Sequence, residues 1–341
     1  MKKTHFDKVF ITNLPAFYKI RLFNEIAKEK KILVIYLGYA DDGRNKDFYN
    51  EIPCFESYNI KASTKSEIIN KFFEVFRSLS YDELILGGWD HIIMWFAAFV
   101  SSRKKNSLIC ESSIYESKTK GIKGLIKKLF ISRINRCYVP GQAQKRIFDE
   151  LKFKGEIVQT KGVGIFNYIS QPLFVPRKTV NKFIFVGRLI EVKNLKLLIS
   201  TFNKLPNEEL YIVGFGEQEN ELKELANDNC HFLGAVSNKD LYRIYQSMDV
   251  FILPSISETW GLVVEEALNN GLPVIVSDKV GCADDLVNNS NGLVFKYDSE
   301  SSLIQAIERM KDIDYYNQLR KNISKLDFGK IEREQVRCYL K

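Results

Sequence analysis

Two cations that lie five residues apart are the first candidates for chemistry in this chain. Arg188 and Lys193 belong to the segment GRLIEVKN, which follows the apolar run FIFV. A guanidinium and an ammonium on a loop that enters a helix can bind a diphosphate and stabilise the charge that develops on a departing phosphate. Solvated basic residues at a helix start look the same in sequence, so this loop alone does not decide its function.

A glycine-containing loop follows the next apolar run. The segment IVGFGEQ places Gly214 and Gly216 there. Glycine has no Cβ, so the backbone at these positions can approach a phosphate closely. A dinucleotide fingerprint needs a third glycine, and this chain has Glu219 in its place. Phosphate contact and a plain tight turn are equally good interpretations of this loop.

A pair of carboxylates in the segment LPSISETWGLVVEEAL is the strongest feature. We predict Glu258 in a loop at the sheet edge, a turn relaxed by Gly261, and a helix that begins near Leu262. Glu266 would lie about one turn into that helix, on its apolar side, and would need a partner. Glu265 would be an ordinary exposed residue that matches the helix dipole. Carboxylates that accept hydrogen bonds from hydroxyls are suited to hold a sugar or a ribose.

The first half of the chain alternates short β-rich runs with longer amphipathic ones. The predicted strands are residues 8–12, 32–37, 83–86, 107–110, 136–139 and 156–160. Helical spacing of apolar residues is found in 18–30, 65–78, 91–102, 121–135 and 142–152. A repeated order of strand and helix predicts a parallel sheet with helices on both faces.

The same pattern restarts after residues 166–181, an aperiodic stretch with two prolines that we interpret as the domain boundary. Strands are predicted at residues 183–186, 210–213, 230–233, 250–253 and 274–277, and helices at 194–204, 217–227, 238–247 and 262–269. Ligands of open α/β sheets bind beyond the carboxyl ends of the strands, so two such domains would enclose a cleft. We expect an N-terminal domain over 1–170, a second over 176–312, and C-terminal helices over 313–341 that pack on the N-terminal domain.

Composition supports two folded domains. The chain has 341 residues, of which 45% are hydrophobic and 27% charged, which excludes a disordered chain. Six cysteines lack a C-x-x-C pair and only three histidines are present, so neither a disulfide scaffold nor a metal site is expected.

Residues 1–175 hold 29 basic and 18 acidic side chains, whereas the remainder holds 21 and 24. Within the basic half, residues 103–136 hold ten Lys and Arg and only two acidic residues, so a partner of this segment should be anionic.

The order and spacing of the motifs resemble the GT-B glycosyltransferases of family 4, which share the glycosyl transferases group 1 domain. The matching motifs are GRLxxxK at 187–193, IVGxG at 212–216, FLGxV at 232–236, DVFxLPS at 249–255, the pair Glu258 and Glu266, GLPVIVSD at 271–278, and NGLVF at 291–295. The likeness is dense over residues 182–295 and covers the first half only in outline. It implies a GT-B fold with two Rossmann-like domains.

The resemblance also implies a donor site in the second domain. Arg188 and Lys193 would grip the diphosphate, Glu258 would hold hydroxyls of the donor sugar, and Glu266 would bind the ribose diol. The other residues implied to contact the nucleotide sugar are Gly187, Gly214, Gly216, Gly234, Val236, Gly261 and Leu262. No cofactor and no metal would be needed beside a nucleotide-diphosphate sugar, with UDP the expected nucleotide. The leaving diphosphate would itself take the acceptor proton, with retention of anomeric configuration.

Some positions depart from the family pattern. Members often carry a histidine after a central strand of the N-terminal domain, where this chain has Glu111 in the segment LICESS. His91 is an alternative, although a histidine that opens an apolar helix more often has a structural role. The catalytic residue on this side stays open between the two. Cys282 and Asp285 replace a usual glycine and a usual glutamate.

The basic segment 118–136, KTKGIKGLIKKLFISRINR, has two interpretations. One helical stripe carries the apolar residues Ile122, Leu125, Ile126, Leu129, Phe130 and Ile134, with Lys123, Lys127, Lys128 and Arg133 elsewhere. The stripe could pack on the sheet while the lysines are solvated. Alternatively, the helix could lie on an anionic membrane near a lipid-linked acceptor. Both can hold, since the same helix can pack partly on the sheet and still present its lysines. No secretion signal is evident, and the most apolar window, 84–100, is too short and too interrupted to span a bilayer. We therefore expect a cytoplasmic protein, with peripheral contact to the inner membrane face under the second interpretation.

The predicted function is transfer of a sugar to a glycan or lipid-linked acceptor in surface polysaccharide or glycoconjugate synthesis. Sugar-nucleotide epimerases and phosphorylases of GT-B architecture are alternatives, but no pyridoxal lysine site is identified for a phosphorylase. A basic nucleic-acid-binding protein is a more distant alternative, because no reader motif is present and the second half is acidic. The donor sugar, its base, the acceptor, the linkage and the oligomeric state remain open.

Overall fold

The computed structural model describes residues 3–38, 46–60 and 65–341, and it divides into two compact units. Among the described residues, the first unit holds 3–38, 48–60, 65–165 and 330–341, and the second holds 46–47 and 166–329. Each unit contains one parallel sheet. The predicted fold class is confirmed.

The first sheet has the strand order β3-β2-β1-β4-β5-β6-β7, and every pairing is parallel. Its strands are β1 (Thr4–Thr12), β2 (Ile32–Tyr36), β3 (Glu56–Asn59), β4 (Leu79–Leu86), β5 (Asn106–Ile109), β6 (Arg136–Val139) and β7 (Glu156–Gln159). Helices of this unit are α1 (Phe17–Ala27), α2 (Lys65–Arg77), α3 (Ile92–Val100), α4 (Gly121–Ile131), α5 (Gln142–Glu150) and α13 (Phe328–Leu340). The part of α13 from Lys330 onward belongs to this unit. Short 3₁₀ turns occur at η1 (Lys46–Tyr49), which spans the two units, and η2 (Arg103–Lys105).

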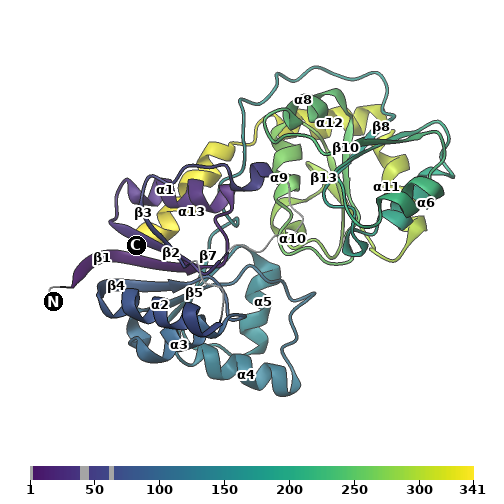
Figure 1. Cartoon of the computed structure of the whole chain (residues 1–341). Helices are drawn as coiled ribbons and strands as arrows, with labels where there is room; N and C mark the ends of the chain where they lie inside the picture. Colours follow the sequence, from purple (N-terminus) through teal and green to yellow (C-terminus); the bar gives the residue numbers. More distant parts are fainter. Residues whose placement is uncertain (1–2, 39–45, 61–64) are drawn as a thin grey trace. The chain divides into compact units, whose positions relative to one another are not determined.

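Both faces of the first sheet are buried, as its apolar strands require. Along β1, Phe10 faces a core formed with α1 and α13, while Val9 and Ile11 face a core formed with α2, α3, α4 and α5. Figure 1 shows α1 and α13 together on one side of this sheet. The ring of Tyr339 in α13 stacks on Tyr138 of β6, with 4.5 Å between ring centroids. The C-terminal helix is therefore part of the first core.

The second sheet has the order β10-β9-β8-β11-β12-β13, again wholly parallel. Its strands are β8 (Lys182–Val186), β9 (Glu209–Val213), β10 (Cys230–Gly234), β11 (Val250–Leu253), β12 (Val274–Ser277) and β13 (Gly292–Phe295). Its helices are α6 (Leu195–Phe202), α7 (Glu219–Leu225), α8 (Leu241–Ser247), α9 (Leu262–Asn269), α10 (Ala283–Leu286), α11 (Glu300–Met310) and α12 (Ile313–Ile323), with a 3₁₀ turn at η3 (Glu191–Lys193). Helices cover both faces (Figure 1).

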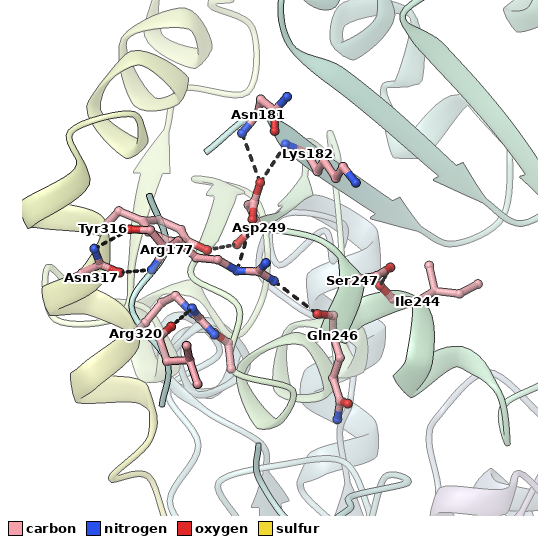
Figure 2. A network of polar contacts seen from close by, with 12 residues as sticks. Arg177, Asn181, Lys182, Ile244, Gln246, Ser247, Asp249, Tyr316, Asn317 and Arg320 are labelled. Carbon is pink, nitrogen blue, oxygen red and sulfur yellow. Dashed lines mark hydrogen bonds and ion pairs between the residues drawn. The ribbon is translucent and has the colours of Figure 1, made fainter. Parts of the chain in front are cut away.

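Asp249 anchors the linker to the second unit at the amino end of β11 (Figure 2). Its buried carboxylate accepts hydrogen bonds from the backbone N–H groups of Asn181 and Lys182, at 3.1 and 3.0 Å. Arg177 pairs with the same carboxylate at 3.6 Å, and the Tyr316 hydroxyl donates to the Asp249 carbonyl at 2.9 Å. This motif residue thus stabilises the start of the sheet, at the edge opposite the loops that carry the candidate site.

Two features of the fold differ from the sequence prediction. Strands β3 and β13 were not predicted; all four residues of β3 are exposed, so no apolar run indicates it, and both strands are at sheet edges. The C-terminal residues 313–341 were predicted to pack together on the N-terminal domain. In the structure, α12 belongs to the second unit and only Lys330–Lys341 group with the first.

Candidate functional site

The candidate site lies at the carboxyl edge of the second sheet, where the strand order reverses between β8 and β11. The loops that follow these two strands meet there. Ile256 N–H donates to the Val192 carbonyl at 2.9 Å, and the Asn194 amide donates to the Pro254 carbonyl at 3.2 Å. Such a switch point is where ligands of open α/β sheets bind.

Lys193 and Glu258 form an ion pair that joins the two loops. Each side chain is about 15% exposed, so the pair is largely shielded but still open to a ligand. The ammonium has three donors and the carboxylate several acceptor positions, so neither group is saturated by the other. Arg188, on the same loop as Lys193, is exposed. The structure therefore brings Lys193 and Glu258 together, as one site requires.

The backbone around Lys193 is held in an unusual conformation. Asn194 adopts a left-handed conformation with φ 58°, between the 3₁₀ turn η3 and helix α6. Its side-chain amide also donates to the Tyr297 carbonyl at 2.9 Å. Asparagine tolerates this region better than most residues do. These contacts orient the end of the loop that carries Lys193.

The glycines of the second loop have a packing explanation. A Cβ on Gly214 would lie 1.8 Å from the Gly187 carbonyl oxygen, and one on Gly216 would lie 2.4 Å from that of Leu189. Gly214 N–H also donates to the carbonyl of Gly234 at 2.8 Å. Both glycines are therefore required for close approach of neighbouring strand-end loops. Their contact with a phosphate stays a prediction, as does the role of Val236.

The backbone around Glu258 is fixed by hydrogen bonds to the segment after β12. Glu258 N–H donates to the Lys279 carbonyl, and Gly281 N–H donates to the Glu258 carbonyl, both at 3.0 Å. Gly261 has φ 102° and precedes Leu262, the first residue of α9. A side chain at Gly261 would both strain the backbone and press on Val280, 3.1 Å from the Cβ position. The turn predicted at this glycine is confirmed.

Glu266 is buried on α9 and has a partner within the protein. It is 9% exposed and accepts a hydrogen bond from the hydroxyl of Tyr245 at 3.3 Å. Burial raises the pKa of Tyr245 well above its usual value, so this hydroxyl remains a donor. The partner that its apolar position demanded is therefore present, and binding of a ribose stays a prediction.

The prediction that Glu265 is exposed is wrong. It is 2% exposed, and the Trp260 indole N–H donates to its carboxyl at 3.1 Å. Burial raises the pKa of Glu265 to about 8. Trp260 is itself buried, so the hydrogen-bonded pair is enclosed within the second unit. The pairing of a tryptophan with a glutamate five positions later was a signal that the sequence analysis missed.

Cys282 and Asp285, which depart from the family pattern, both fit the local structure. Cys282 is fully buried, and its N–H donates to the Trp260 carbonyl at 2.9 Å. Asp285 lies exposed on the short helix α10. Cys282 thus contributes to the packing of the loop that carries Glu258.

The first unit has its own polar pair at the carboxyl edge of its sheet. Lys19 of α1 and Glu111, which follows β5, form an ion pair at 2.9 Å, and both line a pocket with Thr12 and Gly87 from the ends of β1 and β4. His91 instead caps α3, because its Nδ1 accepts from the Ile93 N–H at 3.2 Å. Of the two residues left open by the sequence, Glu111 lines this pocket and His91 has a capping role.

The predicted stripe, which runs from α4 to Ile134 just beyond it, is divided between core and surface. Phe130 and Ile134 are fully buried. Ile122, Leu125 and Leu129 are 77%, 66% and 55% exposed, and Ile126 is exposed as well. The stripe thus packs on the core only in part, which leaves room for both interpretations of the segment. We call the exposed residues Ile122, Leu125, Ile126 and Leu129 the α4 face.

The cations around the α4 face are not equivalent. Lys118, Lys120, Lys123 and Lys128 are exposed. Lys127 instead lies with its Nζ 5.0 Å from the ring centroid of Trp89 and donates to the hydroxyl of Ser117. Its partial burial lowers its pKa. Across residues 3–38, 46–60 and 65–341, no helix has the length and hydropathy to cross a bilayer.

Solved structures of known proteins share this fold. Sucrose-phosphate synthase from Thermosynechococcus elongatus matches with a TM-score of 0.74 at 17% identity, over 97% of this chain and 98% of its own. Together with the two parallel sheets, this likeness defines the fold as GT-B. At this identity the comparison shows the fold alone.

The sequence comparisons show what the second unit is similar to. Residues 173–326 match the family model described as Glycosyl transferases group 1. Sulfoquinovosyl transferase SQD2 of Arabidopsis thaliana is 31% identical over 157 residues, which are 46% of this chain and 30% of that protein. A UDP-Gal:alpha-D-GlcNAc-diphosphoundecaprenol alpha-1,3-galactosyltransferase of Escherichia coli is 32% identical over 155 residues, 42% of this chain and 40% of that protein. The matches thus span less than half the length of these two relatives.

Proposed function

We propose that the protein is a metal-independent family 4 glycosyltransferase that moves a sugar from a nucleotide-diphosphate sugar to a glycan or lipid-linked acceptor, with retention of configuration. The reaction belongs to surface polysaccharide or glycoconjugate synthesis. The observation that carries the proposal is the ion pair of Lys193 and Glu258, at the switch point of a group 1 domain.

The cations act on the diphosphate. Lys193 keeps one N–H on Glu258 and directs others to phosphate oxygens, and exposed Arg188 adds a guanidinium from the same loop. When the bond from the anomeric carbon to the diphosphate breaks, negative charge grows on the departing oxygen, and both cations stabilise that charge. The departing oxygen takes the proton of the acceptor hydroxyl, so no protein nucleophile is needed.

The carboxylates orient the sugar and the nucleotide. Glu258 faces the site through its pair with Lys193 and accepts hydrogen bonds from donor-sugar hydroxyls. Glu266 keeps Tyr245 as donor on one side and accepts from the ribose diol on the other. Both groups bind without reacting.

The acceptor belongs to the first unit. Glu111 and Lys19 offer a carboxylate and an ammonium on a pocket at the carboxyl edge of that sheet. An acceptor hydroxyl can donate to Glu111 while Lys19 binds an acceptor oxygen. One relative's name gives a diphosphoundecaprenol acceptor, which makes a lipid-linked acceptor the first one to test.

Contact with an anionic membrane surface is the second part of the proposal. The α4 face exposes four apolar side chains at helical spacing beside exposed lysines, the composition of a helix that lies in a membrane interface. A polyisoprenoid-linked acceptor would be met at that surface. Peripheral binding on the inner membrane face would then place the enzyme where its substrate is.

A donor screen followed by an acceptor test decides the reaction. Thermal-shift measurements with UDP, GDP, ADP and dTDP sugars identify the nucleotide, and UDP sugars are expected to give the largest shift. Release of nucleoside diphosphate should require an acceptor. Release without one, or interconversion of the donor sugar, would support hydrolysis or epimerisation and contradict transfer.

A further inference from the structure

The buried pair Trp260–Glu265 is close in the chain to Glu258 of the proposed donor site. Trp260 is 1% exposed and Glu265 is 2% exposed, and their hydrogen bond measures 3.1 Å. Trp260 is two residues from Glu258, and Glu265 is on the first turn of α9. The bond therefore links the loop that carries Glu258 to the body of the helix that follows it.

The backbone of the same loop is held from the opposite side. Cys282 N–H donates to the Trp260 carbonyl at 2.9 Å, and Gly281 N–H donates to the Glu258 carbonyl at 3.0 Å. These bonds fix the main chain on the segment after β12, while the indole of Trp260 is fixed on α9. Loss of either support would allow the loop between them to shift, and Glu258 would shift with it.

We propose that Glu265 is a positioning residue, which holds Trp260 and thereby sets the place of Glu258 and of the α9 N-terminus for donor binding. The inference rests on the proposed function of this site. Glu265 acts through Trp260 and does not touch the substrate, since it is enclosed. A displacement of about 1 Å in a substrate-binding group is sufficient to cost a large factor in rate.

The charge state of Glu265 fits this role. Burial raises its pKa to about 8, so near neutral pH the carboxyl is mostly protonated and still accepts from the indole. The titratable groups that interact with it are Glu266 on its own helix and Cys282 on the neighbouring segment, and Cys282 in turn interacts with Glu258 and Asp285. An ionised Glu265 would add a negative charge to this acidic cluster, behind a site that must accept a diphosphate.

Three variants separate positioning from general stability. Glu265→Gln keeps an acceptor for the indole, Glu265→Leu removes it at similar size, and Trp260→Phe removes the donor. We expect Glu265→Gln to keep donor kcat/KM at pH 7 within about 3-fold, and Glu265→Leu and Trp260→Phe each to lower it by about 10-fold or more in folded protein. The double variant Trp260→Phe/Glu265→Leu should keep at least the kcat/KM of the less active single variant, because both substitutions remove the same hydrogen bond. Wild-type kinetics in folded Glu265→Leu, or losses that multiply in the double variant, would overturn the proposal.

Hydrogen exchange supplies a readout that needs no activity. Glu265→Leu should accelerate exchange of the Gly281 and Cys282 amides, which donate to the Glu258 loop, and Glu265→Gln should leave them protected. Unchanged protection in Glu265→Leu would overturn the positioning role even if no donor is ever found. Failure of the proposed function is recognised separately, as wild-type protein that binds no nucleotide sugar. If Glu265→Leu does not fold, the same exchange test on Trp260→Phe decides.

Discussion

The carboxyl edge of the second sheet and the α4 face of the first unit are built in opposite ways. At the sheet edge, Lys193 pairs with Glu258 in a shielded setting, and buried carboxyls behind the pair have partners inside the protein. On α4, apolar side chains are exposed and the neighbouring lysines are solvated. The first arrangement recognises one small polar ligand by geometry, whereas the second suits a surface that has charge and an apolar layer but no fixed shape.

Removal of a site cation should produce the largest effect. Lys193→Ala and Arg188→Ala should each lower kcat by roughly 10²-fold or more and weaken donor binding, because charge on the departing diphosphate loses its stabilisation. Steady-state kinetics with donor and acceptor check this result. Lys196→Ala is the matched control, since Lys196 is an exposed residue of α6 that pairs with Glu221. Wild-type turnover in Lys193→Ala, with an unchanged melting temperature, would remove the assignment.

Charge reversal of exposed lysines beside the α4 face should have the next largest effect, and it tests the other half of the comparison. Each Lys near an anionic surface contributes ~1 kcal/mol, so Lys120→Glu/Lys123→Glu/Lys128→Glu should lower vesicle affinity by about 10²-fold or more. The measurement is co-sedimentation with vesicles rich in anionic lipid, at low and high salt. Lys127 is left intact because its ammonium packs over Trp89.

Two controls sharpen the membrane test. Reversal of the exposed Lys239, Lys321 and Lys325 in the second unit changes the net charge equally and should leave vesicle binding intact. Transfer to a soluble acceptor analogue should survive the α4 reversal. Wild-type protein that ignores vesicles at every ionic strength would mean that the α4 face has another partner and that the acceptor is soluble.

The site carboxylates should show a smaller, divided effect. Glu266→Gln should mainly weaken nucleotide binding, including that of the free diphosphate, by about 10-fold, because charge-assisted hydrogen bonds to the ribose become neutral ones. Glu258→Gln should spare nucleotide binding and lower the rate of transfer. Calorimetry with UDP and kinetics with the UDP sugar separate the two. Loss of UDP affinity in Glu258→Gln, with none in Glu266→Gln, would reverse their roles.

The sequence predicts a structural feature well when the cause of that feature lies in the residues of the same segment. Buried parallel strands are continuous apolar runs, so the strands of both sheets that carry the switch-point loops were predicted within a few residues. Lys193 and Glu258 each follow such an apolar run, so the order of the motifs also predicted that they lie on neighbouring loops. Strand β3 has no buried residue, and its pairing with β2 is a tertiary fact that its own composition does not encode.

The environment of single side chains was less predictable. Helical spacing shows that residues share a face but not what that face meets, and so the exposed part of α4 could not be separated from Phe130 and Ile134. Glu265 was predicted as exposed, but in the structure it is buried and bonded to Trp260, a residue from the preceding loop. Both cases depend on where a neighbouring element packs.

The smallest predicted effect is a pH-dependent difference in stability. The pKa of Glu265 is about 8 in the folded protein against an ordinary 4.5, so between these values the folded state holds a proton that the unfolded state releases. Its stabilising contribution is therefore complete below about pH 4.5 and is lost as the pH rises through about 8. Glu265→Gln has no such dependence, so its melting temperature relative to wild type should rise from pH 5 to pH 9, with about 2–4 °C for each kcal/mol in a domain of this size. Differential scanning fluorimetry measures the difference, and Glu224→Gln on the exposed face of α7 is the control. A difference that stays constant with pH would show that Glu265 is ionised throughout this range.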